Sequence, residues 1–208
     1  MFLKRCLDFA LVVPALIIIS PLLAVIALCI IVDSPGPALF RQVRVGRHGK
    51  LFRILKFRTM VIDAECFGPQ LTVGTDKRVT RVGRFLRRYK LDELPQLINV
   101  LRGEMSLVGP RPEVPRYVAH YSEDAKSAVL SVLPGITDLA SIHFKDENLI
   151  LSGANNFEEV YITKILPVKL SFYLEYVRNR SIYLDIKIIL QTLYSVFIDK
   201  RESRGTGL

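Results

Sequence analysis

The sequence predicts a mainly α-helical protein with a small β-hairpin, an α+β fold in which a kinked N-terminal membrane helix precedes a compact cytoplasmic domain with amphipathic helices. Three observations support this class. Residues 7–32 are almost entirely apolar, residues 39–58 read as two strands around a glycine-bounded turn, and the C-terminal quarter repeats apolar groups at helical spacing. We therefore expect a membrane segment over residues 1–36, a folded domain over 37–199 and a disordered tail over 200–208.

The composition favours a membrane-associated protein with an anionic partner. The 208 residues carry 29 Lys and Arg against 20 Asp and Glu, so the formal net charge is +9. A basic chain attracts polyanions, and a hydrophobic share of 50% favours a membrane surface over nucleic acid as that partner. Three irregularly spaced cysteines and three scattered histidines predict neither a disulfide framework nor a metal site, and they fit a reducing compartment.

The apolar segment is long enough to enter a bilayer. The run LDFALVVPALIIISPLLAVIALCIIV, residues 7–32, contains 22 apolar residues among its 26. As a straight helix it would extend about 39 Å, against a hydrocarbon core of about 30 Å. It exceeds the apolar core of a signal peptide and no small-residue cleavage site follows it, so we expect it to remain in the protein.

Ser20 and Pro21 divide this segment near its middle. Pro21 lacks the N–H that would pair with the carbonyl of Ile17, so we expect a kink there, and Pro14 could add a smaller bend. Basic residues flank the segment on both sides, and the positive-inside rule places both flanks in the cytoplasm. A re-entrant hairpin satisfies both flanks. A proline-kinked transmembrane helix is the alternative that the sequence leaves open.

The folded domain is expected to begin after the stretch SPGP. The segment ALFRQVRVGRHGKLFRILKFRTM predicts two strands joined at Gly46–Gly49, with seven Lys or Arg and no acid in residues 41–58. Helices are expected at Val82–Tyr89 and Pro95–Leu101, the second ended by Gly103. The C-terminal stretch YLDIKIILQTLYSVF predicts an amphipathic helix whose apolar stripe belongs either to the core or to the membrane interface.

Two adjacent acids, Asp92 and Glu93, stand out in the run RRYKLDELPQL. Proline is tolerated in the first turn of a helix, so Pro95 places both acids at a predicted helix start. The helix dipole and the preceding cations then favour the ionised forms, which can act as nucleophile, base or metal ligand. Simple helix capping is the alternative explanation, and it is common.

Several cations are predicted to converge on these acids. Lys56 and Arg58 close the predicted hairpin. Arg87 approaches the acids at helical spacing, and Arg111 is held stiffly between two prolines. The basic stretches also lack the interspersed acids of ordinary solvated faces. Cations that converge on a carboxylate pair beside a membrane segment suit an anionic, phosphorylated substrate.

The motifs resemble those of a known family. The kinked apolar segment with Ser20 and Pro21 is followed by KFRTM, LDELPQL, GEMSLVGPRP and PGIT. This order is typical of bacterial sugar transferases of the monotopic phosphoglycosyl transferase superfamily. The similarity covers roughly residues 1–195, and LDELPQLINVLRGEMSLVGPRP is its most specific block. The chain looks like the minimal, single-domain form, similar to undecaprenyl-phosphate N-acetylated-sugar-1-phosphate transferases.

The resemblance implies an enzyme of the bacterial inner membrane whose catalytic domain, residues 37–199, lies on the cytoplasmic face. Such an enzyme moves a sugar 1-phosphate from a UDP-sugar to polyprenyl phosphate, here undecaprenyl phosphate, and releases UMP. The reaction is the first membrane step of surface glycan or glycoprotein biosynthesis. Expected partners are therefore the two substrates, the lipid bilayer and downstream glycosyltransferases, with no nucleic acid.

The same resemblance assigns residue roles. Asp92 would be the nucleophile that forms a phosphosugar-aspartyl intermediate, and Glu93 would assist at the acceptor phosphate or at Mg²⁺. Both acids are thus the expected metal ligands. The residues expected to bind substrate phosphates are Lys56, Arg58, Arg87 and Arg111.

Two positions depart from the family pattern. Leu133 stands where many relatives have Arg before PGIT, Asp138 stands where they have Gly, and the following LASIHFKDEN also differs. This region is expected to meet the nucleotide or the sugar. The expected donor, a UDP-linked N-acetylated amino sugar, therefore comes from the resemblance and not from these residues.

Two other classes of function fit the composition. A membrane-tethered basic scaffold would have no catalysis and would tolerate amide substitutions at Asp92 and Glu93. A membrane-tethered nucleic-acid-binding protein would bind polyanions with an affinity that falls steeply with salt, and it would not turn over nucleotide sugars.

Overall fold

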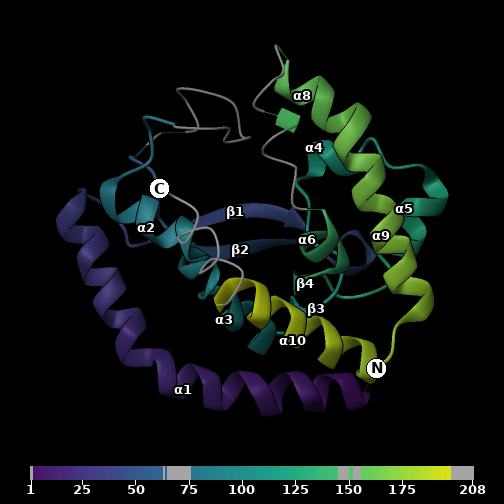
Figure 1. Ribbon diagram of the computed structural model, residues 1–208, viewed down its shortest axis with the longest axis horizontal. Coiled ribbons are helices and arrows are strands. Elements are labelled where there is room, and N and C mark those ends of the chain that lie inside the picture. The colour runs from purple at the N-terminus through teal and green to yellow at the C-terminus, as the bar shows by residue number, and fades with distance from the viewer. Residues whose placement is uncertain (1, 63, 65–75, 145–149, 152–155, 198–208) are drawn as a thin grey trace, which may run out of the picture.

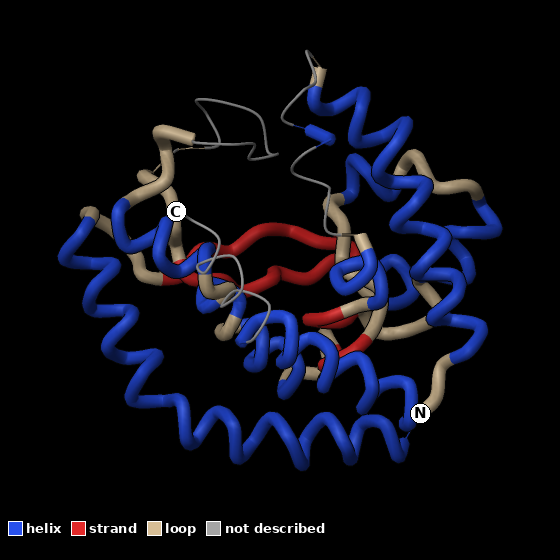
Figure 2. The backbone as a smooth tube through the Cα atoms, in the orientation of Figure 1, coloured by secondary structure: helices blue, strands red, loops and turns tan. Residues whose placement is uncertain are grey.

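The protein is built around a short antiparallel hairpin that helices surround (Figures 1 and 2). The long helix α1 (Phe2–Asp33) runs along one edge and bends, and strands β1 (Leu39–Val45) and β2 (Leu51–Phe57) lie inside the bend. The computed structural model describes residues 2–62, 64, 76–144, 150–151 and 156–197. The tail expected from residue 200 onward lies outside these residues. The expected class, mainly helical with small sheets, is confirmed.

The remaining elements follow in chain order. They are α2 (Arg81–Arg88), the 3₁₀ turn η2 (Leu91–Glu93), α3 (Gln96–Leu101), β3 (Ser106–Val108), α4 (Pro115–Val118), α5 (Glu123–Val129), β4 (Gly135–Thr137), α6 (Leu139–His143), α8 (Phe157–Val160), the π-helical turn η3 (Tyr161–Ile165), α9 (Leu166–Asn179) and α10 (Ile182–Phe197). Both helices expected around the acid pair are therefore confirmed, as α2 and α3.

The predicted hairpin is also confirmed. Its strands pair antiparallel from Leu39↔Phe57 to Val45↔Leu51. The turn η1 (Arg47–Gly49) closes the hairpin, and His48 and Gly49 adopt left-handed φ angles of 58° and 74° there. The buried side chains of β2 form the centre of the protein, between α1 and the rest of the domain.

Helix α1 is continuous through both of its prolines. The Ser20 hydroxyl donates a hydrogen bond of 2.9 Å to the carbonyl of Ile17, the group that Pro21 leaves without its helical N–H partner. Figure 1 shows a bend midway along α1. The predicted kink thus occurs as a bend within one continuous helix, and each limb runs along a different part of the folded domain.

Both limbs of α1 pack on the same body, which explains why they stay apart. Val12 of the first limb joins the cluster around Ile54, and Ile26 of the second joins the cluster around Phe57. The opposite face is apolar but exposed, with Ile18 at 77%. By length and composition alone, α1 is the one helix among the described residues that could cross a membrane.

Polar contacts hold both ends of α1 to this body. Near the N-terminus, Lys4 Nζ donates to Asp185 Oδ2 of α10 at 2.6 Å, and Asp8 Oδ1 accepts from the backbone N–H of Leu107 at 3.1 Å. At the other end, Asp33 Oδ2 accepts from the backbone N–H of Val82 at 3.0 Å. The first and last turns of the apolar helix therefore contact one and the same folded domain.

A two-stranded parallel sheet, β3 with β4, was not expected from the sequence. Its register pairs Ser106 with Gly135 and Val108 with Thr137. A Cβ at Gly135 would lie 2.1 Å from the backbone nitrogen of Gly109, so only glycine allows the two chains to approach this closely. The sheet places the loop after β3, which carries Arg111, beside the loop after β4.

Helix α10 combines the two alternatives that its sequence left open. Ile188 is fully buried and packs with Leu139 and Tyr176 in a core cluster. On the other face, Tyr183 and Leu190 are 78% and 60% exposed. One stripe of α10 therefore belongs to the core, and a second apolar stripe faces outward.

Candidate active site

Asp92 and Glu93 occupy the single 3₁₀ turn η2 between α2 and α3. Lys90 ends the preceding turn with a left-handed φ of 55°, and Pro95 caps α3. A non-glycine residue in the left-handed region is uncommon, and such strain is often found at functional sites. Both acids were expected at the start of the second helix; they lie in a turn of their own immediately before α3, which begins at Gln96.

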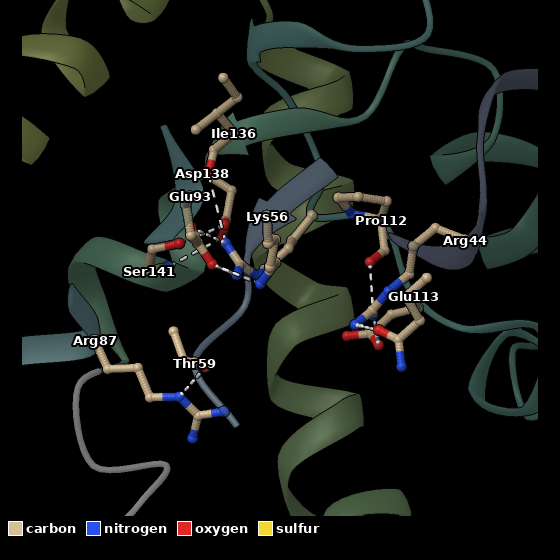
Figure 3. A network of polar contacts seen from close by, with 12 residues as sticks. Arg44, Lys56, Thr59, Arg87, Glu93, Pro112, Glu113, Ile136, Asp138 and Ser141 are labelled. Carbon is tan, nitrogen blue, oxygen red and sulfur yellow. Dashed lines mark hydrogen bonds and ion pairs between the residues drawn. The ribbon is translucent and has the colours of Figure 1, made fainter. Parts of the chain in front are cut away.

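Glu93 is held by two cations that come from distant segments. Lys56 Nζ at the end of β2 donates to Glu93 Oε1 at 2.9 Å. Arg111 binds both carboxylate oxygens, with Nη2 on Oε1 and Nη1 on Oε2 at 3.2 Å. Burial by itself would raise the pKa of Glu93, but Arg111 and Lys56 hold this pKa well below its ordinary value. Glu93 is therefore a fixed, ionised group (Figure 3).

Asp92 differs from its neighbour in its polar contacts. Among the described residues, its carboxylate makes no hydrogen bond and no ion pair, and the side chain is only partly buried. Burial, and then the charge of Glu93, raise the pKa of Asp92 above its ordinary value, against the opposing effects of Lys56, Arg87 and Arg111. This direction is opposite to the one expected from the cations, because desolvation outweighs them.

The loop that carries Arg111 is fixed from both sides. The backbone N–H of Gly109 donates to the carbonyl of Thr137 at 3.1 Å, and Gly135 donates to the carbonyl of Pro110 at 2.9 Å. Arg111 Nη1 also lies 3.5 Å from the carbonyl of Ile136. The parallel sheet and the flanking prolines thus aim the guanidinium at Glu93.

Arg87 stands on the other side of the acid pair. Its Nε donates to Thr59 Oγ1 at 2.8 Å, which fixes the plane of the guanidinium. Burial lowers the pKa of Arg87, and Asp92 is the first group that opposes this shift. Lys56, Arg87 and Arg111 are therefore brought together around the two carboxylates, as the sequence predicts.

Arg58 is in a different environment from the other three cations. Its Nη1 and Nη2 donate to the backbone carbonyls of Pro35 and Ser34 at 2.7 and 2.5 Å, and the residue is 7% exposed. Both terminal nitrogens therefore face the end of α1 and not the acid pair.

Three further residues of this region were missed by the sequence reasoning. Arg44 lies on the same face of the hairpin as Lys56, and its Nη1 donates to the carbonyl of Pro112 at 3.1 Å. It also lies 3.6 Å from Glu113 Oε2, and the hydroxyl of Tyr161 donates to Glu113 Oε1 at 2.6 Å. The alternating pattern of the hairpin could have placed Arg44, whereas nothing in the sequence joins Tyr161 to Glu113.

A metal ion at this site would depend on its substrate. Among the described residues, no group of three or more His, Cys, Asp or Glu side chains could hold a metal. Mg²⁺ usually binds through one or two carboxylates together with substrate phosphates. Asp92 offers unpaired oxygens for such a site, whereas Glu93 could contribute only after releasing a cation. The donor set therefore fits Mg²⁺ that arrives with a phosphorylated substrate.

Comparison with known proteins gives a consistent result over nearly the whole chain. Residues 1–199 match the model of the family described as bacterial sugar transferase. The chain is 41% identical over 202 residues, 95% of its length, to the UDP-glucose:undecaprenyl-phosphate glucose-1-phosphate transferase of Escherichia coli (strain K12). It is 36% identical over 197 residues, 94% of its length, to the UDP-N-acetylgalactosamine-undecaprenyl-phosphate N-acetylgalactosaminephosphotransferase of Aeromonas hydrophila.

This chain covers a larger share of a third relative. It is the UDP-glucose:undecaprenyl-phosphate glucose-1-phosphate transferase of Caulobacter vibrioides, 40% identical over 197 residues, 93% of this chain. The match covers 69% of that protein, but only 41% of the Escherichia coli and 44% of the Aeromonas hydrophila protein. The chain thus spans less than half of the length of these two relatives.

Proposed function

This chain belongs to the bacterial sugar transferase family, and we propose that it transfers a sugar 1-phosphate from a UDP-sugar to polyprenyl phosphate, with release of UMP. The observation that carries the proposal is the contrast within the acid pair: Asp92 has no hydrogen bond or ion pair with any described residue, while its neighbour Glu93 is held by Lys56 and Arg111. The relatives named above act on UDP-glucose or UDP-N-acetylgalactosamine and on undecaprenyl phosphate. Because their sugars differ, the proposal extends to UDP-sugars as a class.

The unpaired carboxylate of Asp92 suits a nucleophile. In the proposed first step, one Asp92 oxygen attacks the phosphorus that bears the sugar, and the bond from this phosphorus to the UMP oxygen breaks. UMP leaves, and the sugar phosphate remains on Asp92 as an acyl phosphate. In the second step, an oxygen of polyprenyl phosphate attacks the same phosphorus and releases the Asp92 carboxylate.

The surrounding cations make this attack feasible. A carboxylate that approaches a diphosphate meets a repulsion of about 4 kcal/mol per pair of unit charges at 4 Å, for an effective dielectric constant of 20. Lys56, Arg87 and Arg111 can offset this repulsion and follow the charge toward the leaving phosphate. Mg²⁺, held by Asp92 and the substrate phosphates, and by Glu93 once it releases a cation, would supply further charge neutralisation when bound.

We propose a re-entrant position for α1, in the inner membrane with the folded domain on the cytoplasmic face. Both ends of α1 contact this one domain, through Lys4 and Asp8 at one end and Asp33 at the other. A helix that spans the bilayer would have its ends about 30 Å apart, on opposite sides. The exposed apolar face of α1 and the outer stripe of α10 would then contact lipid.

Cysteine labelling tests this topology. The test uses Leu3→Cys in a background without the native cysteines, and a membrane-impermeant maleimide applied to intact cells. We expect no labelling until the cells are permeabilised, because both ends of α1 would face the cytoplasm. Labelling from outside would contradict the re-entrant position.

An assay of UMP release tests the proposed reaction. The full chain in lipid nanodiscs is incubated with a panel of UDP-sugars, with and without undecaprenyl phosphate. We expect continuous UMP release with at least one donor only when the acceptor lipid is present. Absence of release with every donor would overturn the proposal and favour a non-catalytic scaffold, the alternative that family membership does not favour.

A further inference from the structure

Arg58 is the predicted phosphate ligand that the structure places away from the acid pair, and its contacts point to another role. Its guanidinium binds the carbonyls of Ser34 and Pro35, which follow directly on α1. Arg58 is 7% exposed, so these contacts are shielded from water. A buried, forked contact of this kind fixes two segments relative to each other.

The turn after α1 is shaped around this guanidinium. Gly36 has a φ of +115°, in the region that favours glycine. A Cβ at Gly36 would lie 2.2 Å from Arg58 Nη1 and 2.6 Å from a carbon of Ile62. The turn therefore accommodates the guanidinium only because residue 36 has no side chain.

Thr59, the residue after Arg58, connects this segment to α2. The carbonyl of Thr59 accepts from the backbone N–H of Thr80 at 3.0 Å, and a Cβ at Gly83 would lie 2.1 Å from that carbonyl oxygen. Thr59 Oγ1 accepts from Arg87 Nε at 2.8 Å. Asp33, at the end of α1, accepts from the backbone N–H of Val82 in the first turn of α2.

These contacts form one continuous chain from the apolar helix to the acid pair. It runs from the end of α1 through Arg58 and Thr59 to Arg87, whose charge faces Asp92. Lys56, the partner of Glu93, lies on β2 two residues before Arg58, which directly follows the strand. A shift at the end of α1 would therefore move the cations that surround both carboxylates.

We infer that Arg58 is a positioning residue, which joins the end of the membrane helix to Arg87 and does not itself bind substrate. The inference rests on the proposed transfer reaction. It adds a connection between the position of α1 against the folded domain and the cations at the acid pair. A direct phosphate ligand would contribute to donor binding. A positioning residue contributes to the rate of the chemical step, because small displacements of a catalytic group are costly there.

Enzyme kinetics separate the two roles. Arg58→Met is compared with Arg53→Met, which removes the same charge from an exposed position on β2, the strand that precedes Arg58. We expect Arg58→Met to lower kcat by about ten- to a hundredfold with little change in KM for the UDP-sugar. Arg58→Lys keeps the charge but cannot bind both carbonyls at once, so its kcat should lie between those of Arg58→Met and the wild type. The kcat of Arg53→Met should match that of the wild type. A rise in KM alone would assign Arg58 to the substrate and overturn the inference.

We call the contact of the Arg58 guanidinium with the carbonyls of Ser34 and Pro35 the clamp. A second variant tests this clamp without removing any charged group. Gly36→Ala would displace the Arg58 guanidinium, whereas Gly49→Ala introduces a similar positive-φ strain at a site with nothing within 4 Å of the new Cβ. Gly36→Ala should lower kcat as Arg58→Met does, and the double variant should be no worse than either single one. Full activity of Gly36→Ala would contradict the clamp.

The link to Arg87 is tested by a double-mutant cycle. If Arg58 acts through Arg87, the ΔΔG‡ of the double variant should be much smaller than the sum of the ΔΔG‡ values of Arg58→Met and Arg87→Met. Independent losses would overturn the inference.

Hydrogen exchange gives a readout that does not require turnover. The backbone amide of Thr80 is bound by Thr59 and that of Val82 by Asp33. Both amides should exchange faster in Arg58→Met than in the wild type, and at the wild-type rate in Arg53→Met. Unchanged exchange in Arg58→Met would overturn the clamp even in an active enzyme. If the wild type fails to turn over any UDP-sugar while exchange responds as expected, the proposed reaction fails and the clamp stands.

Discussion

Two ion-paired clusters lie close together in this protein, and they use similar residues differently (Figure 3). In the first, Lys56 and Arg111 bind Glu93, and the preceding residue, Asp92, has no polar partner among the described residues. In the second, Arg44 pairs with Glu113 and donates to the carbonyl of Pro112, and the hydroxyl of Tyr161 donates to Glu113, whose exposed fraction is only 5%. Beside the first cluster, the carboxylate of Asp92 is available to a substrate, whereas both oxygens of Glu113 have partners within the protein.

The comparison shows that an ion pair alone does not identify a reactive site. Charges that partner each other and the backbone, in a closed interior, support structure. A carboxylate that is desolvated and surrounded by cations, but has no direct partner, remains able to react with a substrate. Four predictions, from the largest expected effect to the smallest, test this distinction.

Asp92→Asn should abolish turnover, by about ten-thousandfold or more, because an amide cannot replace a carboxylate nucleophile. The protein is incubated with UDP-sugar without acceptor, quenched in acid and weighed intact. We expect a phosphosugar adduct on the wild type and none on the variant. Asp124→Asn, an exposed acid on α5, serves as the control and should retain the adduct. An adduct on Asp92→Asn would move the nucleophile to another residue.

Arg111→Ala should lower turnover by about ten- to a hundredfold, the loss expected for one charge-assisted contact of about 1.5–3 kcal/mol. The flanking prolines and the parallel sheet should preserve the loop, so circular dichroism and thermal unfolding should change little. Arg116→Ala, which removes an exposed arginine of α4 that pairs with Glu158, is the matched control and should remain active. Equal activity of the two variants would place Arg111 among ordinary surface ion pairs.

Tyr161→Phe should affect stability and not catalysis, because it leaves Glu113 Oε1 without its donor inside a closed cluster. We expect the free energy of unfolding to fall by about 1–3 kcal/mol, with turnover close to that of the wild type. Tyr183→Phe, whose ring is 78% exposed, should change neither quantity. If Tyr161→Phe instead lost activity at unchanged stability, the second cluster would belong to the reaction.

The pH dependence of kcat/KM should report the ionisation of Asp92. Attack requires the carboxylate, so the rate falls as the pH drops through the pKa of Asp92, which burial raises. The charge of Arg87 lowers this pKa, so Arg87→Met should raise it further and shift the acidic limb to higher pH. Arg84→Met, exposed on the same helix, should leave the limb in place. A shift to lower pH would show that another group controls the limb.

The acid pair and most of the surrounding cations could be predicted from local sequence. Pro95 limits where α3 can begin, and this limit places Asp92 and Glu93 at its start. The strand alternation of the hairpin and the helical spacing of α2 placed Lys56 and Arg87 near them. Arg111 could be expected at the site because its two prolines restrict the loop. These are short-range effects, so they act within a few residues and can be read in order along the chain.

The partners of these residues depended on contacts between distant segments. The sequence separates Glu93 from Lys56 by 37 residues and Arg58 from Ser34 by 24, and no local rule connects them. The parallel sheet that aims Arg111 consists of two three-residue strands, too short to show a periodic pattern. Local pattern and residue type thus determined where charged groups could gather. Only the packing of α1, the hairpin and the parallel sheet decided that Glu93 is paired, that Asp92 has no partner among the described residues, and that Arg58 faces the end of α1. Pairing follows from which side chains the folded backbone brings within reach.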